Sequence, residues 1–160
     1  MSLARAKAHL ARFGLDERIQ LFEVSSATVE LAAQAVGCEG ARIAKTLSFL
    51  LPDGPLLILA AGDAKIDNGR FKAQFHTKAK MIPHEEVEER IGHGVGGVCP
   101  FGVNGGTAVY LDESLRRFPV VYPAAGTPNS AVRLTLDELE RASGSLGWID
   151  VCKGWREDAG

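Results

Sequence analysis

The sequence predicts a single α/β or α+β domain with a mixed sheet, spanning residues 1–160. Two observations favour this fold class: helical and strand patterns alternate along the chain, and only short turns separate them. No internal repeat or low-complexity linker divides the sequence. With 160 residues, of which 46% are hydrophobic, the chain is long enough to bury one core.

The N-terminal part predicts a helix, a strand and a second helix. Apolar residues recur at helical spacing over 3–13, and the glycine that follows is a typical helix stop. IQLFEV (19–24) predicts a strand. The segment SSATVELAAQAVG predicts a helix that begins at Ser25 or Ser26 and ends at Gly37.

A hairpin and two further helices are expected next. The apolar segments 43–51 and 56–61 predict two strands, and the turn PDGP joins them. A helix is expected near 69–76. Another is expected after Pro83, because two glutamates in its first turn complement the helix dipole.

The C-terminal third predicts three strands, a helix and a closing strand. The helix has the capping-box spacing Thr135-x-x-Glu138, in which each residue caps the other's backbone N–H. In chain order these elements are expected at 107–111, 118–123, 131–135, 136–142 and 148–152.

Composition limits the classes of partner and cofactor. The 18 basic and 20 acidic residues nearly cancel, so any nucleic-acid contact is expected to be local. The best candidate segment is 64–80, with five basic residues and one acid. The three cysteines form no C-x-x-C pair, and the histidines lack metal-ligand spacing, so neither a metal nor another cofactor is predicted. No membrane-spanning run and no signal-peptide core occurs, which predicts a cytoplasmic protein.

The segment GVGGVCPFGVNGG (94–106) is unusually rich in glycine. A literal G-x-G-x-x-G occurs at Gly92, Gly94 and Gly97, but VCPFG follows where a dinucleotide site needs a helix. One interpretation is a mobile connector. The other is a loop whose backbone N–H groups converge on a ligand oxygen while Pro100 stiffens it.

A lysine interrupts the strand IAKTLSFL. Strand alternation places Lys45 on the same face as apolar neighbours, and Thr46 on the opposite face. A charged amine there is costly unless it reaches solvent or a partner. Lys45 is therefore either an edge lysine with its ammonium in water or a cation at the floor of a cleft.

Together these segments resemble the YbaK and prolyl-tRNA synthetase-associated editing domains. The resemblance spans nearly the whole chain, and its most specific parts are Lys45-Thr46-Leu47 and the G-x-x-x-P loop from Gly96 to Pro100. It implies a barrel-like mixed sheet with surrounding helices and an active cleft between the lysine and the loop. It also implies a trans-acting hydrolase of mischarged tRNA, which binds the tRNA acceptor end and works with prolyl-tRNA synthetase as a possible partner.

The resemblance also implies roles for individual residues. Water attacks the ester, backbone N–H groups of the loop stabilise the oxyanion, and Lys45 anchors the terminal phosphate or ribose. The catalytic residues expected on this basis are Lys45, Gly96, Gly97 and Val98. The expected substrate-binding residues are Thr46, Cys99, Pro100, Phe101, Gly126, Thr127, Asn129 and Ser130.

The amino acid and the reaction class stay open at this point. Where some relatives carry an acid or a histidine, AAGTPNSAV offers only Thr127, Asn129 and Ser130 as polar groups. Small residues suit alanine, serine, cysteine or 2-aminobutyrate, for which tRNA(Pro) is the expected carrier. The alternatives are a non-catalytic module that binds aminoacyl-tRNA or a nucleotide, and a small-ester hydrolase with Cys99 as nucleophile and His93 as base.

Overall fold

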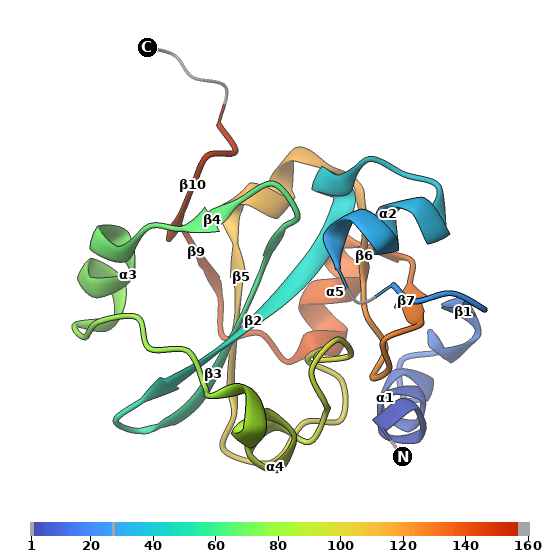
Figure 1. Ribbon diagram of the computed structural model, residues 1–160, viewed down its shortest axis with the longest axis horizontal. Coiled ribbons are helices and arrows are strands. Elements are labelled where there is room, and N and C mark those ends of the chain that lie inside the picture. Colours follow the sequence, from blue (N-terminus) through green and yellow to red (C-terminus); the bar gives the residue numbers. More distant parts are fainter. Residues whose placement is uncertain (1, 27, 157–160) are drawn as a thin grey trace.

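A mixed six-stranded sheet forms the centre of the computed structural model, which describes residues 2–26 and 28–156 (Figure 1). A long antiparallel hairpin, β2 and β3, occupies the middle of the sheet. Strands β6 and β5 add in parallel on its two sides, β8 pairs antiparallel with β6, and β9 pairs parallel with β5. The strands are β2 (Ile43–Leu51), β3 (Gly54–Ala61), β5 (Ala108–Asp112), β6 (Val120–Pro123), β8 (Leu134–Thr135) and β9 (Trp148–Ile149).

Two short antiparallel pairs flank this sheet. Strand β1 (Ile19–Leu21) pairs with β7 (Ser130–Val132). Strand β4 (Lys65–Ile66) pairs with β10 (Cys152–Lys153), so the end of the described chain lies beside the segment that follows β3 (Figure 1).

Five α-helices surround the sheet in the described part of the chain. Four 3₁₀ turns, at 16–18, 40–42, 84–86 and 113–117, connect elements. None of the described helices is long and apolar enough to cross a bilayer. The helices are α1 (Ser2–Ala11), α2 (Val29–Val36), α3 (Asn68–Phe75), α4 (Val87–Ile91) and α5 (Leu136–Ser143).

The core is centred on β3. Every side chain from Leu56 to Ala61 is completely inaccessible to solvent, which is typical of a strand covered on both faces. Phe49 of β2 packs on Phe71 of α3 with ring centroids 5.0 Å apart, and Phe101 fills the core from the glycine-rich segment. Since β2 pairs with β3 from Ala44 to Leu51, this packing fixes the position of Lys45 and Thr46.

The predicted fold class, a mixed α/β sheet with barrel-like curvature and surrounding helices, is confirmed. The hairpin is confirmed, and so is the capping box, in which the Thr135 hydroxyl accepts from the N–H of Glu138 at 3.2 Å. The predicted cap of α2 is wrong: Thr28 caps the helix by accepting the N–H of Leu31 at 3.1 Å. Ser26 instead binds the carbonyl of Pro128, which holds it in the wall of a cleft.

Two predicted strands are each divided in the structure. The segment 131–135 contributes β7 to one sheet and β8 to another, with Arg133 between them. The segment 148–152 is interrupted because the Val151 N–H donates to the carboxylate of Asp112 at 2.9 Å rather than to a strand. The chain then leaves the main sheet and continues into β10.

Candidate active site

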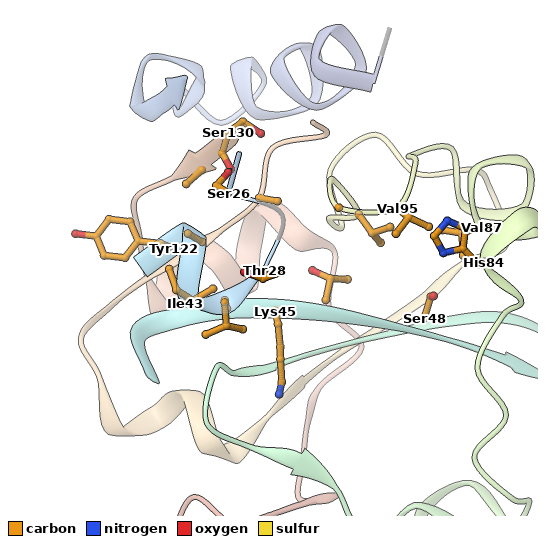
Figure 2. Close-up of a pocket in the computed structure, with 18 of the residues that line it drawn as sticks. Ser26, Thr28, Ile43, Lys45, Ser48, His84, Val87, Val95, Tyr122 and Ser130 are labelled. Atoms are coloured by element: carbon orange, nitrogen blue, oxygen red, sulfur yellow. The ribbon is translucent and has the colours of Figure 1, made fainter. Parts of the chain in front are cut away.

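A cleft of about 340 Å³ opens along β2. Its walls come from the N-terminal end of α2, the segment from Met81 to Val87, the loop 95–98 and the ends of β6 and β7 (Figure 2). Five segments distant in sequence therefore meet around the strand that carries Lys45 and Thr46. A volume of this size accommodates a small ligand group.

The two ends of the cleft differ in chemistry. Hydroxyl-bearing side chains gather at one end, where Ser26 and Ser130 lie close together (Figure 2). Val87, Val95, Ser48 and the exposed ring of His84 lie at the other end (Figure 2). Polar side chains therefore lie at both ends of the cleft, and the two valines add apolar surface at the second end.

Thr46 supplies a polar atom without a partner. Its Oγ1 is buried and forms no hydrogen bond with any described residue. Thr46 lines the cleft together with the buried Ser48, two residues further on the same strand face. An orphaned buried hydroxyl costs free energy, so a ligand that pairs with it binds favourably.

Two residues of the glycine-rich loop line the cleft and have backbone N–H groups that are unpaired within the described chain. Gly96 and Val98 line it, and no acceptor within the described ranges takes the N–H of either residue. Gly97 does not line the cleft, and its N–H donates to the carbonyl of Gly94 at 3.0 Å. The left-handed backbone is at Gly96 (φ 91°), where an L side chain would be strained.

Only glycine fits at position 97, because another loop packs directly against its backbone. A Cβ at this position would lie 2.5 Å from the nitrogen of Thr127 and 2.6 Å from the carbonyl carbon of Gly126. The two loops are therefore packed backbone to backbone. Gly97 sets the position of its neighbours in the cleft wall rather than contacting the cleft itself.

The polar groups of the segment 125–130 mainly bind one another. The Ser130 hydroxyl donates to the carbonyl of Thr127 at 3.0 Å and accepts the N–H of Ala125 at 3.1 Å. Thr127 Oγ1 donates to the side-chain oxygen of Asn129 at 2.8 Å, and Asn129 Nδ2 donates to the carbonyl of Phe22 at 3.0 Å. Of the four substrate-binding residues expected here, only Ser130 lines the cleft.

Lys45 lines the cleft, but its ammonium is directed elsewhere. Nζ donates to the carbonyl oxygens of Ala64 and of Gly62, the latter at 3.4 Å. In Figure 2 the side chain points away from Ser26, Ser130 and Thr28. Burial is the largest effect on its pKa and lowers it, while Asp63 acts in the opposite direction. The ammonium is therefore not at the floor of the cleft in this structure.

Cys99, Pro100 and Phe101 pack in the interior. Cys99 and Phe101 have no solvent-accessible surface, and none of the three lines the cleft. Cys99 Sγ lies 3.6 Å from Nε2 of His93, a geometry that resembles a catalytic pair. Burial, however, raises the pKa of Cys99 to about 12, and His93 Nε2 is engaged with the carbonyl of Phe101 at 2.6 Å.

Several cleft residues were not singled out from sequence. Four residues line the cleft although no functional motif in the sequence contains them: Ser26, Ser48, His84 and Tyr122. Ser48 had a usable signal, since strand alternation places it on the face of Thr46. The other three come from segments that only the tertiary fold brings to β2.

The comparisons with known proteins agree on one family. Residues 23–142 match the aminoacyl-tRNA editing domain. The chain is 50% identical over 156 residues to the uncharacterized protein YwhH of Bacillus subtilis (strain 168), covering 97% of this chain and 99% of YwhH.

Solved structures show the same similarity. A crystal structure described as a candidate trans-editing enzyme for prolyl-tRNA synthetase is 34% identical with a TM-score of 0.86, covering 96% of this chain and 98% of that one. The hypothetical protein APE2540 is 26% identical with a TM-score of 0.76, covering 85% of this chain and 91% of that one.

Proposed function

The chain belongs to the aminoacyl-tRNA editing family, and we propose that it is a trans-acting deacylase of tRNA mischarged with a small amino acid. One observation carries the proposal: among the described residues, Gly96, Val98 and Thr46 line a single cleft, and the backbone N–H groups of the two loop residues and the hydroxyl of Thr46 have no hydrogen-bond partner. These donors suit an ester carbonyl whose oxygen gains negative charge during hydrolysis.

The proposed reaction uses water as the nucleophile. Water adds to the ester carbonyl, the N–H groups of Gly96 and Val98 stabilise the oxyanion, and the bond to the ribose oxygen then breaks. The ribose oxygen takes the proton that the attacking water gives up, and the second water hydrogen stays on the new carboxyl group, which gives free amino acid and uncharged tRNA. Each preorganised donor contributes about 3 kcal/mol in other hydrolases, and an ester between an amino acid and a ribose hydroxyl needs no stronger nucleophile.

Lys45 is assigned to anchoring rather than to proton transfer. Among the described residues, its ammonium donates hydrogen bonds to the carbonyls of Gly62 and Ala64, which are neutral acceptors that a phosphate can replace. A flexible stem carries the charge, so the ammonium can follow a ligand. Gly97 is assigned to positioning, since it holds the neighbouring N–H groups against the Gly126 loop.

The substrate is proposed from size and from likeness. Alanines at four positions keep the cleft walls small, which suits alanine, serine, cysteine or 2-aminobutyrate. They are Ala32, Ala44, Ala124 and Ala131. Likeness to the candidate trans-editing enzyme favours tRNA(Pro) as carrier and prolyl-tRNA synthetase as partner. A cytoplasmic location is part of the same proposal, because the enzyme would act where tRNA is charged.

A thiol mechanism has less support than water attack. Cys99 is fully buried outside the cleft, and its raised pKa disfavours the thiolate that attack requires. A purely binding role would leave the cleft intact but produce no turnover.

A deacylation panel tests the proposal. Purified protein is incubated with tRNA(Pro) carrying each of the four small amino acids, with proline as the matched control. We expect at least one of the four esters to be hydrolysed well above the spontaneous rate, and Pro-tRNA(Pro) to be spared. Binding of all five without hydrolysis would establish the non-catalytic alternative instead.

A further inference from the structure

A group of lysines lies on the side of β2 to which the Lys45 ammonium points. Ala64, whose carbonyl accepts from Lys45, directly precedes Lys65 at the start of β4. Lys65 is paired across the β4–β10 ladder with Lys153, and both side chains are exposed. Lys45, Lys65 and Lys153 are called the lysine group below.

The pairing of Lys65 with Lys153 is unfavourable for the fold. Residues directly opposite in an antiparallel pair have Cβ atoms about 5 Å apart, and like charges there are destabilising. Among the described residues, every ion pair with a carboxylate is made by an arginine and none by a lysine. The charge of Lys65 also opposes that of Lys45, whose pKa is lowered first by burial and further by Lys65.

The nearby carboxylates are already engaged. Asp63 binds the guanidinium of Arg117 at 2.5 and 2.9 Å, and Asp150 binds Arg70 and Arg156. Asp67 caps α3 by accepting the N–H of Arg70 at 3.0 Å, and its pKa is lowered first by that hydrogen bond and further by the charge of Lys153, so Asp67 offsets only part of the repulsion between Lys65 and Lys153. Glu30, at the start of α2, is the remaining acid whose charge acts on Lys45.

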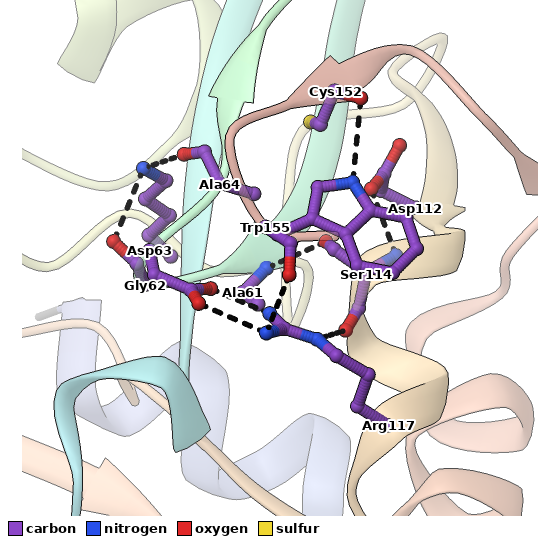
Figure 3. Close-up of polar contacts among 10 residues, drawn as sticks. Ala61, Gly62, Asp63, Ala64, Asp112, Ser114, Arg117, Cys152 and Trp155 are labelled. Carbon is purple, nitrogen blue, oxygen red and sulfur yellow. Dashed lines mark hydrogen bonds and ion pairs between the residues drawn. The ribbon is translucent and has the colours of Figure 1, made fainter. Parts of the chain in front are cut away.

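The backbone around the lysine group is held in place. Arg117 links Asp63 to the carbonyl of Trp155, and the Trp155 indole N–H donates to the carbonyl of Cys152 at 3.3 Å (Figure 3). Gly154 approaches the Asp63 carbonyl, where a Cβ would lie 3.9 Å away. The strand that carries Lys153 is therefore fixed against the turn that receives the Lys45 ammonium.

We propose that Lys65, Lys153 and the ammonium of Lys45 bind phosphodiester groups of the single-stranded acceptor end of the tRNA. The inference rests on the proposed function, because it takes the terminal ribose ester to occupy the cleft on the other side of Lys45. A phosphate between Lys65 and Lys153 relieves their repulsion. Lys45 belongs to both regions and so connects phosphate binding to the position of the ester.

The test compares substrates with and without phosphates. Three substrates are used: an aminoacyl-adenosine, an aminoacylated CCA trinucleotide and the full aminoacyl-tRNA. For the double variant K65Q/K153Q we expect KM on the trinucleotide and on tRNA to rise about three- to tenfold relative to KM on the adenosine. The slope of log KM against log salt should fall by about 0.7, because the phosphate that lies between the two lysines is no longer neutralised. The control is Lys7→Gln on α1, far from β4 and β10 (Figure 1).

A charge reversal separates binding from folding. Lys65→Glu places a carboxylate opposite Lys153, so its unfolding temperature should equal or exceed that of the wild type while KM for tRNA rises. An unchanged KM and salt slope for both variants on tRNA would overturn the inference while leaving the function intact. Failure of the wild type to hydrolyse any ester would instead refute the function, and the anisotropy of a labelled, uncharged CCA-ending RNA would still decide whether the lysines bind phosphate.

Discussion

Gly97→Ala should impair both the fold and the reaction, through one contact that the structure defines. The new Cβ would lie 2.5 Å from the Thr127 nitrogen, and an ordinary contact begins near 3.4 Å. The two loops must therefore separate by roughly 0.9 Å, and both colliding groups are backbone. Overpacking of this kind costs about 1–3 kcal/mol. At about 2–4 °C per kcal/mol for a chain of this size, the unfolding temperature should fall by roughly 2–12 °C.

The same displacement should slow deacylation more than it weakens the fold. The N–H groups of Gly96 and Val98 flank Gly97, and a misplacement of about 1 Å costs on the order of 100-fold in rate. Gly105→Ala is the matched control, because its Cβ would meet nothing within 4 Å and its φ lies outside the left-handed region. Single-turnover deacylation well below the unfolding temperature, together with calorimetry, measures both effects. A folded Gly97→Ala protein with the rate of Gly105→Ala would refute the positioning role.

Three further predictions concern single side chains. Lys45→Ala should stay folded, with a loss of about 1–3 kcal/mol of stability because the carbonyls of Gly62 and Ala64 lose a donor, and it should lose most single-turnover activity. Full activity in the folded variant would show that Lys45 is not part of the site. Cys99→Ser should retain most activity in the same assay, and a trapped acyl-cysteine in the wild type would point to the thiol mechanism. The free energy of unfolding should fall as pH drops below about 6.5, because burial lowers the pKa of His93 in the folded state. Protonation at Nδ1 would also create a buried N–H donor that has no acceptor among the described residues. His93→Gln should flatten this dependence in unfolding temperatures measured from pH 8 to 5, although His9 has a pKa shift of the same sign and preserves part of the slope.

Local signals were sufficient for most helices and for the hairpin. The capping box of α5 involves residues three positions apart, so the sequence contains the whole interaction. The cap of α2 was mispredicted because several hydroxyl residues precede the helix, and the choice among them depends on the carbonyl of Pro128, about a hundred residues away. The division of the predicted strands 131–135 and 148–152 was missed for a similar reason, because the two parts of each segment pair with strands of different sheets.

The candidate site was predictable in part. Lys45, Thr46 and the Gly96 loop meet at one cleft, as the resemblance implied. The direction of the Lys45 ammonium depends on the turn after β3, and the role of Gly97 depends on contact with the loop at Gly126. Both are tertiary contacts, so the pattern of residues along the chain contains no signal for them.

The central claim, that backbone N–H groups of the glycine-rich loop stabilise the oxyanion, is tested most directly by replacing the amide at Val98 with an ester. Incorporation of the α-hydroxy analogue of valine at position 98 exchanges the N–H for an oxygen and keeps the side chain. The same exchange at exposed Val24, outside the cleft, is the control. We predict that the single-turnover rate on the best small aminoacyl-tRNA falls by about 10²–10³ with the Val98 ester, and that the control ester leaves it unchanged. Equal rates for the two folded ester proteins would contradict the account.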